Sequence, residues 1–271
     1  MRSPILRQSC QEGNNERHLR GHWTLTTYDT IGRGYGHTRR EDPRITAAIS
    51  AQIAPCRSVL NVGAGLGSYE PRDRFVVGAD ISTLMLRQRP PGSGPAVQAD
   101  ASRLPFPNNS FDGTLAVLTL HHWDDWRAGL KELIRVASKT TVILTWYPIA
   151  DDFWLFHYFP ELRLVDSAKF PSADQIADIV GPIDVRPLPI PHDCEDGFLG
   201  AYWRRPELYL DDPVRNGISS FHQIKGIAWG VEKLREDLDS GAWKRDNADL
   251  LQRADLDLGY RIVVSTAGRN L

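Results

Sequence analysis

The sequence predicts an α/β fold of the Rossmann-like, doubly wound type, with about seven strands in a mostly parallel sheet. Short β-branched runs alternate with runs of helical periodicity, a pattern typical of right-handed βαβ units. The first predicted strand runs directly into a glycine-rich turn at residues 63–67. The 271 residues are 41% hydrophobic and 24% charged, which is the composition of a globular chain that can bury a core.

The expected strands are short runs rich in β-branched residues, separated by turn-forming ones. They cover residues 57–62, 74–80, 96–100, 112–120, 140–146, 184–190 and 259–265. Their apolar centres are typical of strands buried on both faces of a sheet. Pro187 and Pro189 interrupt the sixth run, so we expect that strand at an edge.

Helices are expected over residues 43–53, 82–89, 126–137, 172–180 and 218–238. Asp42 suits the N-cap of the first helix and Pro43 its first helical position. Ser172 suits an N-cap, and Gly181 follows the end of the same helix. In 218–238, apolar residues recur at spacings of three and four beside a polar face of mixed charge. This pattern favours a core helix or a dimer surface over a membrane-surface helix.

Charge and cysteine content narrow the class of protein. The formal net charge of −2 comes from 32 basic and 34 acidic residues, so no overall basic field favours nucleic acid. No run approaches the roughly 20 apolar residues of a membrane span. The N-terminus lacks the apolar run of a signal peptide. Cys10, Cys56 and Cys194 are far apart, as expected in a reducing compartment, so we expect a cytoplasmic protein.

The glycine-rich turn and the carboxylate of Asp80 indicate a nucleotide-type ligand. Gly63, Gly65 and Gly67 let the backbone bend tightly and let a ligand approach it. Asp80 ends the next strand, where a carboxylate can accept hydrogen bonds from ribose hydroxyls. Ser68 breaks the dinucleotide pattern G-x-G-x-x-G, and no G-K-[ST] follows for a P-loop.

The motifs over residues 57–147 resemble those of class I S-adenosylmethionine-dependent methyltransferases. The run 59–67 (VLNVGAGLG) looks like their first motif, and 79–82 (ADIS) looks like their ribose-binding motif. The block 99–112 (ADASRLPFPNNSFD) and the following 120–123 (LHHW) are similar to the branch with ubiquinone/menaquinone-type and natural-product methyltransferases. The resemblance implies S-adenosylmethionine as the methyl donor and S-adenosylhomocysteine as its product.

The resemblance also implies roles for individual residues. The expected cofactor-binding residues are Tyr35, Arg39, Gly63, Ala64, Gly65, Gly67, Asp80, Ile81, Asp100, Ala101 and Leu118. The glycine loop would pack on the methionine and ribose groups, and Asp80 would hold the ribose hydroxyls. Ile81 would pack on adenine, Asp100 would accept its amino group, and the backbone N–H of Ala101 would lie nearby.

Some of these residues have a purely structural alternative. Asp100 suits an Asx turn before the Leu-Pro segment. Tyr35 and Arg39 would grip the cofactor carboxylate, or else contribute N-terminal packing and surface charge. Leu118, or its neighbour Thr119, would line the pocket. Pro71 departs from the family pattern, because it would shorten or kink the helix that normally follows the glycine loop.

The implied domain organisation is a single methyltransferase domain over 23–271, after a flexible tail at 1–22. Within the domain, residues 57–147 form the cofactor-binding core. Residues 148–257 are expected to form a substrate lid and a helical insertion, and 258–271 the final strand.

His121 and His122 are the candidate catalytic residues. They follow the fourth strand, where an acceptor should meet the donor methyl group, and histidine exchanges protons near neutral pH. The alternative is that they shape the pocket or bond to backbone. The later His157, His192 and Asp193 are weaker candidates. Adjacent side chains diverge, so these histidines and the aspartates after them do not suggest a metal site, and none is expected.

An aromatic cluster follows the fifth strand and is either an apolar lid or plain core. It comprises Phe153, Trp154, Phe156, Tyr158 and Phe159, which Tyr202, Trp203 and Trp229 would join. As a lid, it favours a flat or lipophilic acceptor.

The sequence therefore predicts methyl transfer to a small-molecule acceptor, aromatic or lipophilic in character. Oxygen is the preferred target, with ring carbon or nitrogen as alternatives. Neither nucleic acid nor membrane is expected as a partner, and the protein would be a monomer or a homodimer. The competing functions are methylation of tRNA or protein, and a non-catalytic or NAD-binding Rossmann protein. The identity of the acceptor cannot be read from these residues.

Overall fold

The computed structural model describes residues 39–147, 153–167 and 170–266. The predicted tail at 1–22 and the candidate Tyr35 lie outside these residues. Residues 267–271 of the predicted final segment 258–271 also lie outside them. Within the described residues, no helix combines the length and the apolar character needed to cross a membrane.

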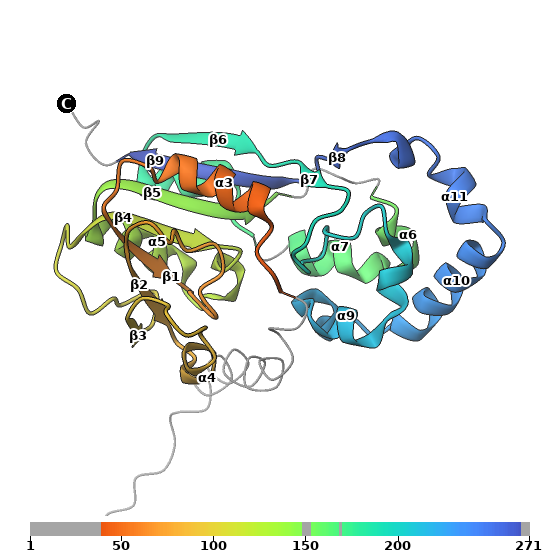
Figure 1. Cartoon of the computed structure of the whole chain (residues 1–271), viewed down its shortest axis with the longest axis horizontal. Helices are drawn as coiled ribbons and strands as arrows, with labels where there is room; N and C mark the ends of the chain where they lie inside the picture. The colour runs from red at the N-terminus through yellow and green to blue at the C-terminus, as the bar shows by residue number, and fades with distance from the viewer. Residues whose placement is uncertain (1–38, 148–152, 168–169, 267–271) are drawn as a thin grey trace, which may run out of the picture.

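A seven-stranded sheet forms the centre of the molecule, with the order β3-β2-β1-β4-β5-β9-β6 (Figure 1). Its strands are β1 Ser58–Val62, β2 Phe75–Asp80, β3 Ala96–Gln98, β4 Phe111–Val117, β5 Ala137–Trp146, β6 Ile183–Pro187 and β9 Tyr260–Thr266. The first five strands pair in parallel, and β9 pairs antiparallel with both β5 and β6. The predicted fold class is confirmed, and the proline-containing β6 lies at an edge as predicted.

Alternate residues of the strands belong to two separate cores, one on each face of the sheet. Val59 packs with residues of α3 (Pro43–Gln52), whose buried side chains include Ile45 and Ile49. Its neighbour Leu60 packs instead with residues of α5 (Trp126–Val136) and α8 (Ala173–Val180). This alternation follows from the two-residue period of a strand. The helices therefore cover both faces, as in a doubly wound fold.

The connection between β1 and β2, residues 63–74, contains no helix. Pro71 was expected only to shorten or kink a helix here. A buried polar cluster stabilises the connection instead, because Glu70 accepts from Asn61 Nδ2 at 3.0 Å and from both terminal nitrogens of Arg89 at 2.8 and 2.7 Å. Arg89 lies just beyond α4 (Thr83–Arg87), the short helix that follows β2.

The helical insertion gathers at one end of the sheet (Figure 1). Its elements are α6 Leu155–Tyr158, α7 Pro160–Ser167, η2 Pro206–Leu210, α9 Asp212–Asn216, η3 Ser219–Gln223, α10 Ile227–Asp239, α11 Ala242–Asp246 and η4 Leu250–Gln252. A small two-stranded sheet, β7 Ile190–Pro191 with β8 Asp255–Leu256, joins the insertion to the main sheet. The prediction of one helix over 218–238 was wrong, since α10 begins only at Ile227. Gly226 precedes its first turn, where a glycine interrupts helical backbone easily.

The aromatic cluster after β5 forms the core of this insertion. Phe153, Trp154, Phe156, Tyr158 and Phe159 are all at most 8% exposed. Trp154 packs edge-to-face on Tyr209 and Trp243, and its indole N–H donates to the carbonyl of Trp203 at 2.8 Å. Packing, and not a lid over the acceptor, therefore explains these aromatic residues. Trp229 points to solvent with 61% exposure.

Candidate functional site

The first cavity lies beyond the carboxyl ends of β1, β2 and β4, where a doubly wound sheet binds its ligands. It has a volume of about 110 Å³. The predicted residues that line it are Arg39, Gly63, Ala64, Gly65, Asp80, Ile81, Asp100, Ala101, Leu118 and His122. Gly67 does not line it, and a Cβ at this position would meet the Arg89 and Glu70 side chains. The structure thus brings together residues from five segments of the chain.

The glycine loop is held tightly against the sheet. The N–H groups of Gly63 and Ala64 both donate to the carbonyl of Ala79, at 2.8 and 3.0 Å. Gly63 and Gly65 have φ values of 70° and 50°, in the region that favours glycine. The loop therefore presents backbone, without Cβ atoms at these two positions, to the first cavity.

Asp80 anchors the loop while facing the cavity. Its Oδ2 accepts from the Gly65 N–H at 2.7 Å, and its Oδ1 accepts from the Ser82 N–H at 2.8 Å. Burial raises the pKa of this carboxyl above its ordinary value. A carboxylate can accept about four hydrogen bonds, so these two contacts leave acceptor capacity for hydroxyl groups.

Asp100 forms the Asx turn that was the structural alternative to its role in cofactor binding. Its Oδ1 accepts from both the backbone N–H and the hydroxyl of Ser102 at 2.8 Å, which is an Asx turn. The same carboxylate is exposed and lines the first cavity. The turn thus orients the carboxylate without removing it from the cavity.

Strand β4 ends earlier than predicted, and this places the histidines. The strand stops at Val117, Leu118 takes a left-handed φ of 47°, and a 3₁₀ turn, η1 Leu120–His122, follows. The chain therefore turns sharply at the sheet edge, with the Leu118 N–H donating to the Leu144 carbonyl at 2.8 Å. His122 faces both the first cavity and a second one, and His121 lines the second only.

The second cavity, of about 60 Å³, adjoins the first. Arg39, Leu118 and His122 line both cavities and so form their shared wall. The remaining lining combines the aromatic residues Trp146, Phe170, Phe198 and Tyr260 with His121, two aliphatic residues and two serines. His121 stacks on Phe170 at a centroid distance of 4.3 Å and contacts the His122 ring at 3.7 Å.

Arg39 is fixed by an ion pair with the insertion. Its Nε donates to Asp196 Oδ1 at 2.6 Å and its Nη2 to Asp196 Oδ2 at 3.2 Å. The weaker candidates His157, His192 and Asp193 are absent from the described lining of both cavities. Asp193 instead forms an exposed ion pair with Arg44 at 2.7 Å.

Sequence reasoning missed most of the second cavity. Trp146 is the last residue of β5 and pairs with Tyr260, the first residue of the antiparallel β9. Their position at the binding edge of the sheet was a usable signal. Phe198 and Asp196 lie between the elements of the insertion, and no local pattern points to them.

The comparisons with known proteins agree with this arrangement. The family model described as a methyltransferase domain matches residues 60–144. A demethylmenaquinone methyltransferase of Corynebacterium urealyticum is 32% identical over 126 residues, which is 42% of this chain and 54% of that protein. A ubiquinone/menaquinone biosynthesis C-methyltransferase of Stenotrophomonas maltophilia is 31% identical over 48% of this chain and 61% of its own length. The chain thus spans about half of the length of these curated relatives.

Solved structures extend the likeness to nearly the whole chain. A protein of Anabaena variabilis, described as a methyltransferase from an antibiotic biosynthesis pathway, is 31% identical with a TM-score of 0.80. That match covers 84% of this chain and 99% of the other. A [4+2]-cyclase shares only the fold, at 13% identity and a TM-score of 0.53. By its motifs, its sheet order and this likeness over 84% of its length, the chain belongs to the class I S-adenosylmethionine-dependent methyltransferases.

Proposed function

We propose that this protein transfers a methyl group from S-adenosylmethionine to a small-molecule acceptor bound in the second cavity. The observation that carries the proposal is the wall shared by the two cavities, formed by Arg39, Leu118 and His122. Methyl transfer needs donor and acceptor in adjoining sites, because the reaction is an in-line displacement that depends on alignment. Two cavities with a common wall meet this requirement.

The charges of the first cavity fit the proposed methyl donor. Its described lining contains one basic side chain of the Lys or Arg type, Arg39, which suits the carboxylate of the donor's amino-acid group. Asp80 suits the ribose hydroxyls, and Ile81 with Asp100 suits adenine. When bound, the donor supplies a methyl group on a positively charged sulfur, already activated for displacement. The protein's own residues then bind, orient and exclude water.

The second cavity indicates a planar acceptor. Rings from Trp146, Phe170, Phe198 and Tyr260 surround it, and such faces favour stacking with a flat apolar group. For a hydroxyl acceptor, the oxygen would form the new bond to the methyl carbon as the bond from that carbon to the donor's sulfur breaks and leaves a neutral thioether. The hydroxyl proton would pass to an imidazole. His122 is our preferred base because it faces both cavities, and His121 is the alternative.

Methylation at a ring carbon is the second candidate. The Stenotrophomonas maltophilia relative is named a C-methyltransferase of ubiquinone/menaquinone biosynthesis, and the Corynebacterium urealyticum relative is named a demethylmenaquinone methyltransferase. A ring carbon that accepts a methyl group must also lose a proton, so the same histidines would serve. Nitrogen acceptors remain compatible with the cavity.

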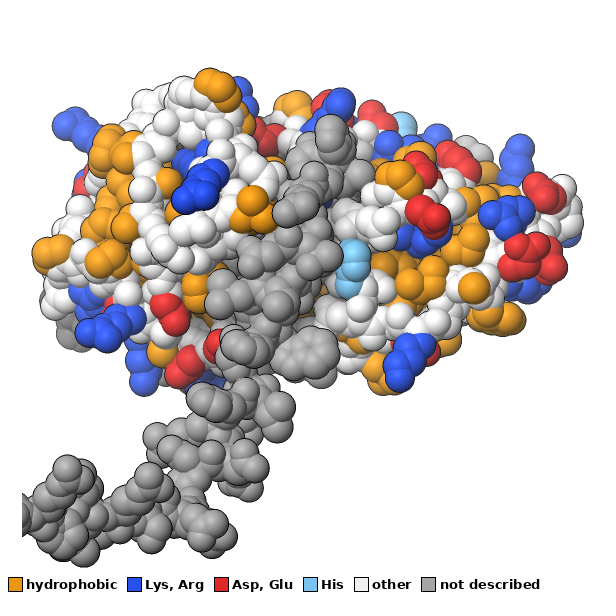
Figure 2. All heavy atoms as spheres, turned by 90° about the horizontal axis from the view of Figure 1, so that it is seen from below, with side chains coloured by type: hydrophobic (Ala, Val, Ile, Leu, Met, Phe, Trp, Pro, Cys, Tyr) orange, Lys and Arg blue, Asp and Glu red, His pale blue; other side chains and the backbone are white. Residues whose placement is uncertain are grey.

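A macromolecular acceptor is less favoured than a small one. Among the described residues on the face shown in Figure 2, basic and acidic side chains are interspersed. The second cavity lies between the sheet edge and the insertion and is small. We further propose that the protein works in the cytoplasm, since the two described cysteines, Cys56 and Cys194, are buried free thiols. A monomer or a homodimer is the proposed form.

Calorimetric titration with S-adenosylmethionine, S-adenosylhomocysteine and NAD tests the donor assignment. We expect both sulfur compounds to bind and NAD not to bind. Labelled methyl transfer to a panel of phenols, quinols and aromatic amines then tests the acceptor. Binding of NAD without either sulfur compound would overturn the proposed function.

A further inference from the structure

We propose that Asp196, together with Tyr69, is a positioning residue that holds Arg39 in the wall shared by the two cavities. The inference rests on the proposed function, because it assumes that Arg39 contacts the carboxylate of the methyl donor. It assigns a role in donor binding to the insertion, which lies far from the cofactor motifs in sequence.

The Asp196 carboxylate collects four hydrogen bonds from three parts of the chain. Arg39 donates through Nε and Nη2, and the Tyr69 hydroxyl donates to Oδ2 at 2.7 Å. The neighbouring Gly197 N–H donates to Oδ1 at 2.7 Å. Asp196 is 1% exposed and Tyr69 is fully buried, so these hydrogen bonds lie in the protein interior and not at its surface.

Arg39 needs such support because of where it lies. It precedes α3, which begins at Pro43, so no helix or strand fixes its backbone. An arginine side chain also loses rotamer entropy when it is held in one geometry, so it takes one orientation only where partners hold it. The pair with Asp196 engages the edge of the guanidinium that carries Nε and Nη2, and it fixes the plane of the group. A guanidinium carries five N–H donors in total. The Arg39 side chain is 12% exposed.

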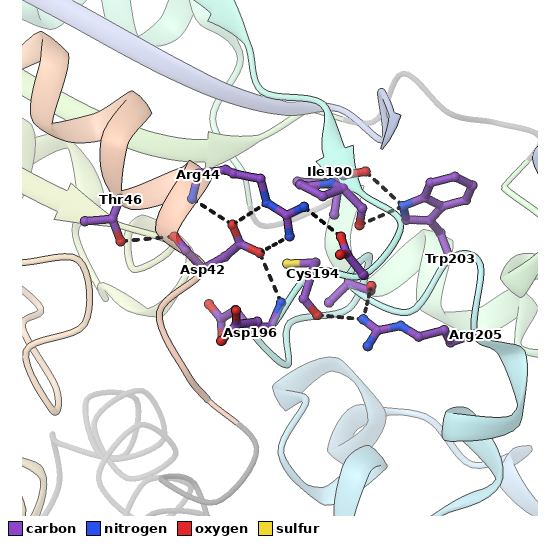
Figure 3. A network of polar contacts seen from close by, with 12 residues as sticks. Asp42, Arg44, Thr46, Ile190, Cys194, Asp196, Trp203 and Arg205 are labelled. Carbon is purple, nitrogen blue, oxygen red and sulfur yellow. Dashed lines mark hydrogen bonds and ion pairs between the residues drawn. The ribbon is translucent and has the colours of Figure 1, made fainter. Parts of the chain in front are cut away.

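The segment that carries Asp196 is itself tied to the N-terminus of α3 (Figure 3). Asp42, the N-cap of α3, accepts from the Glu195 N–H at 3.1 Å, and Arg205 donates to the Cys194 carbonyl at 2.6 Å. The two residues that directly precede Asp196 are therefore both held by side chains from elsewhere in the fold. This rigidity lets one carboxylate orient a cation.

Tyr69 links the same carboxylate to the glycine loop. The residue has a φ of 64°, its N–H donates to Glu41 at 3.1 Å, and its side chain lines the first cavity. Burial, followed by the charge of Asp196, raises the pKa of the Tyr69 hydroxyl, so it stays a donor. The network thus joins the insertion, Arg39 and the cofactor loop.

Asp196 could act on Arg39 by orienting it or by neutralising its charge. The two roles predict opposite changes in the binding of an anionic ligand when Asp196 loses its charge. If Asp196 mainly neutralises Arg39, its removal would strengthen the binding of an anionic group. If it mainly orients Arg39, its removal would weaken that binding. The geometry points to the second outcome.

The test compares two ligands in wild type and Asp196→Asn. S-adenosylhomocysteine carries the amino-acid carboxylate, and 5′-methylthioadenosine lacks it. We expect Asp196→Asn to weaken S-adenosylhomocysteine about tenfold, the size of a charged hydrogen bond, and to leave methylthioadenosine within about twofold. Glu195→Gln is the matched control, because it removes an exposed charge from the adjacent position. We expect it to change neither affinity.

Tyr69→Phe keeps the ring and removes only the hydroxyl, so it carries the test if Asp196→Asn does not fold. We expect a loss of about threefold for S-adenosylhomocysteine alone. Equal weakening of both ligands, or unchanged or tighter binding of S-adenosylhomocysteine, would overturn the inference. Wild-type protein that binds neither ligand would instead overturn the proposed function.

Discussion

Gly63 and Thr119 meet where β1 and β4 end, and a Cβ on Gly63 would overlap the Thr119 hydroxyl. Gly63 also has a φ of 70°, so an alanine there meets both backbone strain and a fixed neighbour. The glycine loop therefore lies as close to the sheet edge as its backbone allows. This contact brings the first cavity directly above β1 and β4.

Gly63→Ala should be far more damaging than Gly65→Ala. At Gly65 a Cβ would meet only the end of the Met85 side chain, at 3.4 Å, and the cost is mainly the left-handed backbone, about 1–2 kcal/mol. At Gly63 the collision adds to that strain. Urea unfolding of both variants measures the difference. Equal losses of stability would show that the contact with Thr119 relaxes freely.

Asp80→Ala should weaken S-adenosylhomocysteine by about 1–3 kcal/mol, because it removes a charged acceptor from the first cavity. Calorimetry at pH 7.5 measures the change. Burial raises the pKa of Asp80, so wild-type affinity should also start to fall at a higher pH than for an ordinary aspartate. The exposed Asp73, which pairs with Arg74, offers the control Asp73→Ala. Unchanged affinity in Asp80→Ala would mean that the ribose lies elsewhere.

His122→Ala should slow methyl transfer more than His121→Ala, once an acceptor is known. His122 faces both cavities, whereas His121 is stacked on Phe170 in the second. Loss of a general base costs about 10²–10⁴-fold in turnover. The comparison is made at saturating donor, with donor affinity measured separately. If neither variant slows turnover, both histidines only shape the cavity.

The stability of the folded chain should fall in acid through Asp42. Burial alone would raise the pKa of this fully buried carboxyl, but hydrogen bonds from Arg44 and from the Glu195 N–H outweigh burial and lower it from 3.8 to about 2. The carboxylate therefore stabilises the fold above pH 3.8, and this contribution, on the order of 2 kcal/mol, is lost as the pH falls towards 2.

Asp42→Asn keeps the N-cap and removes the charge, so its stability deficit should shrink between pH 5 and about pH 2. Urea unfolding of both proteins across this range measures the deficit. A deficit that stays constant with pH would show that Asp42 contributes through packing and capping only.

Local sequence patterns predicted those features that depend on residues close together in the sequence. The alternation of strands and helices predicted the sheet. Of the residues predicted around the glycine turn, Gly63, Gly65, Asp80 and Asp100 line one cavity, whereas Gly67 does not. Proline at position 187 predicted an edge strand for the simple reason that it lacks an N–H. The helical periodicity over 218–238 gave a wrong prediction of one helix. The apolar spacing continues from η3 into α10, although Gly226 separates the two elements.

By itself, the sequence determined the fold class, the family and the end of the sheet where the first cavity lies, since these depend on short motifs whose geometry is set by neighbouring residues. Only the tertiary structure decided that the aromatic cluster at 153–159 is core and that Trp146, Phe198 and Tyr260 line the second cavity. It also decided that Asp196 reaches Arg39 across 157 positions of sequence. The physical reason is that burial and ion pairing between distant segments depend on how the insertion packs against the sheet, which no local pattern encodes.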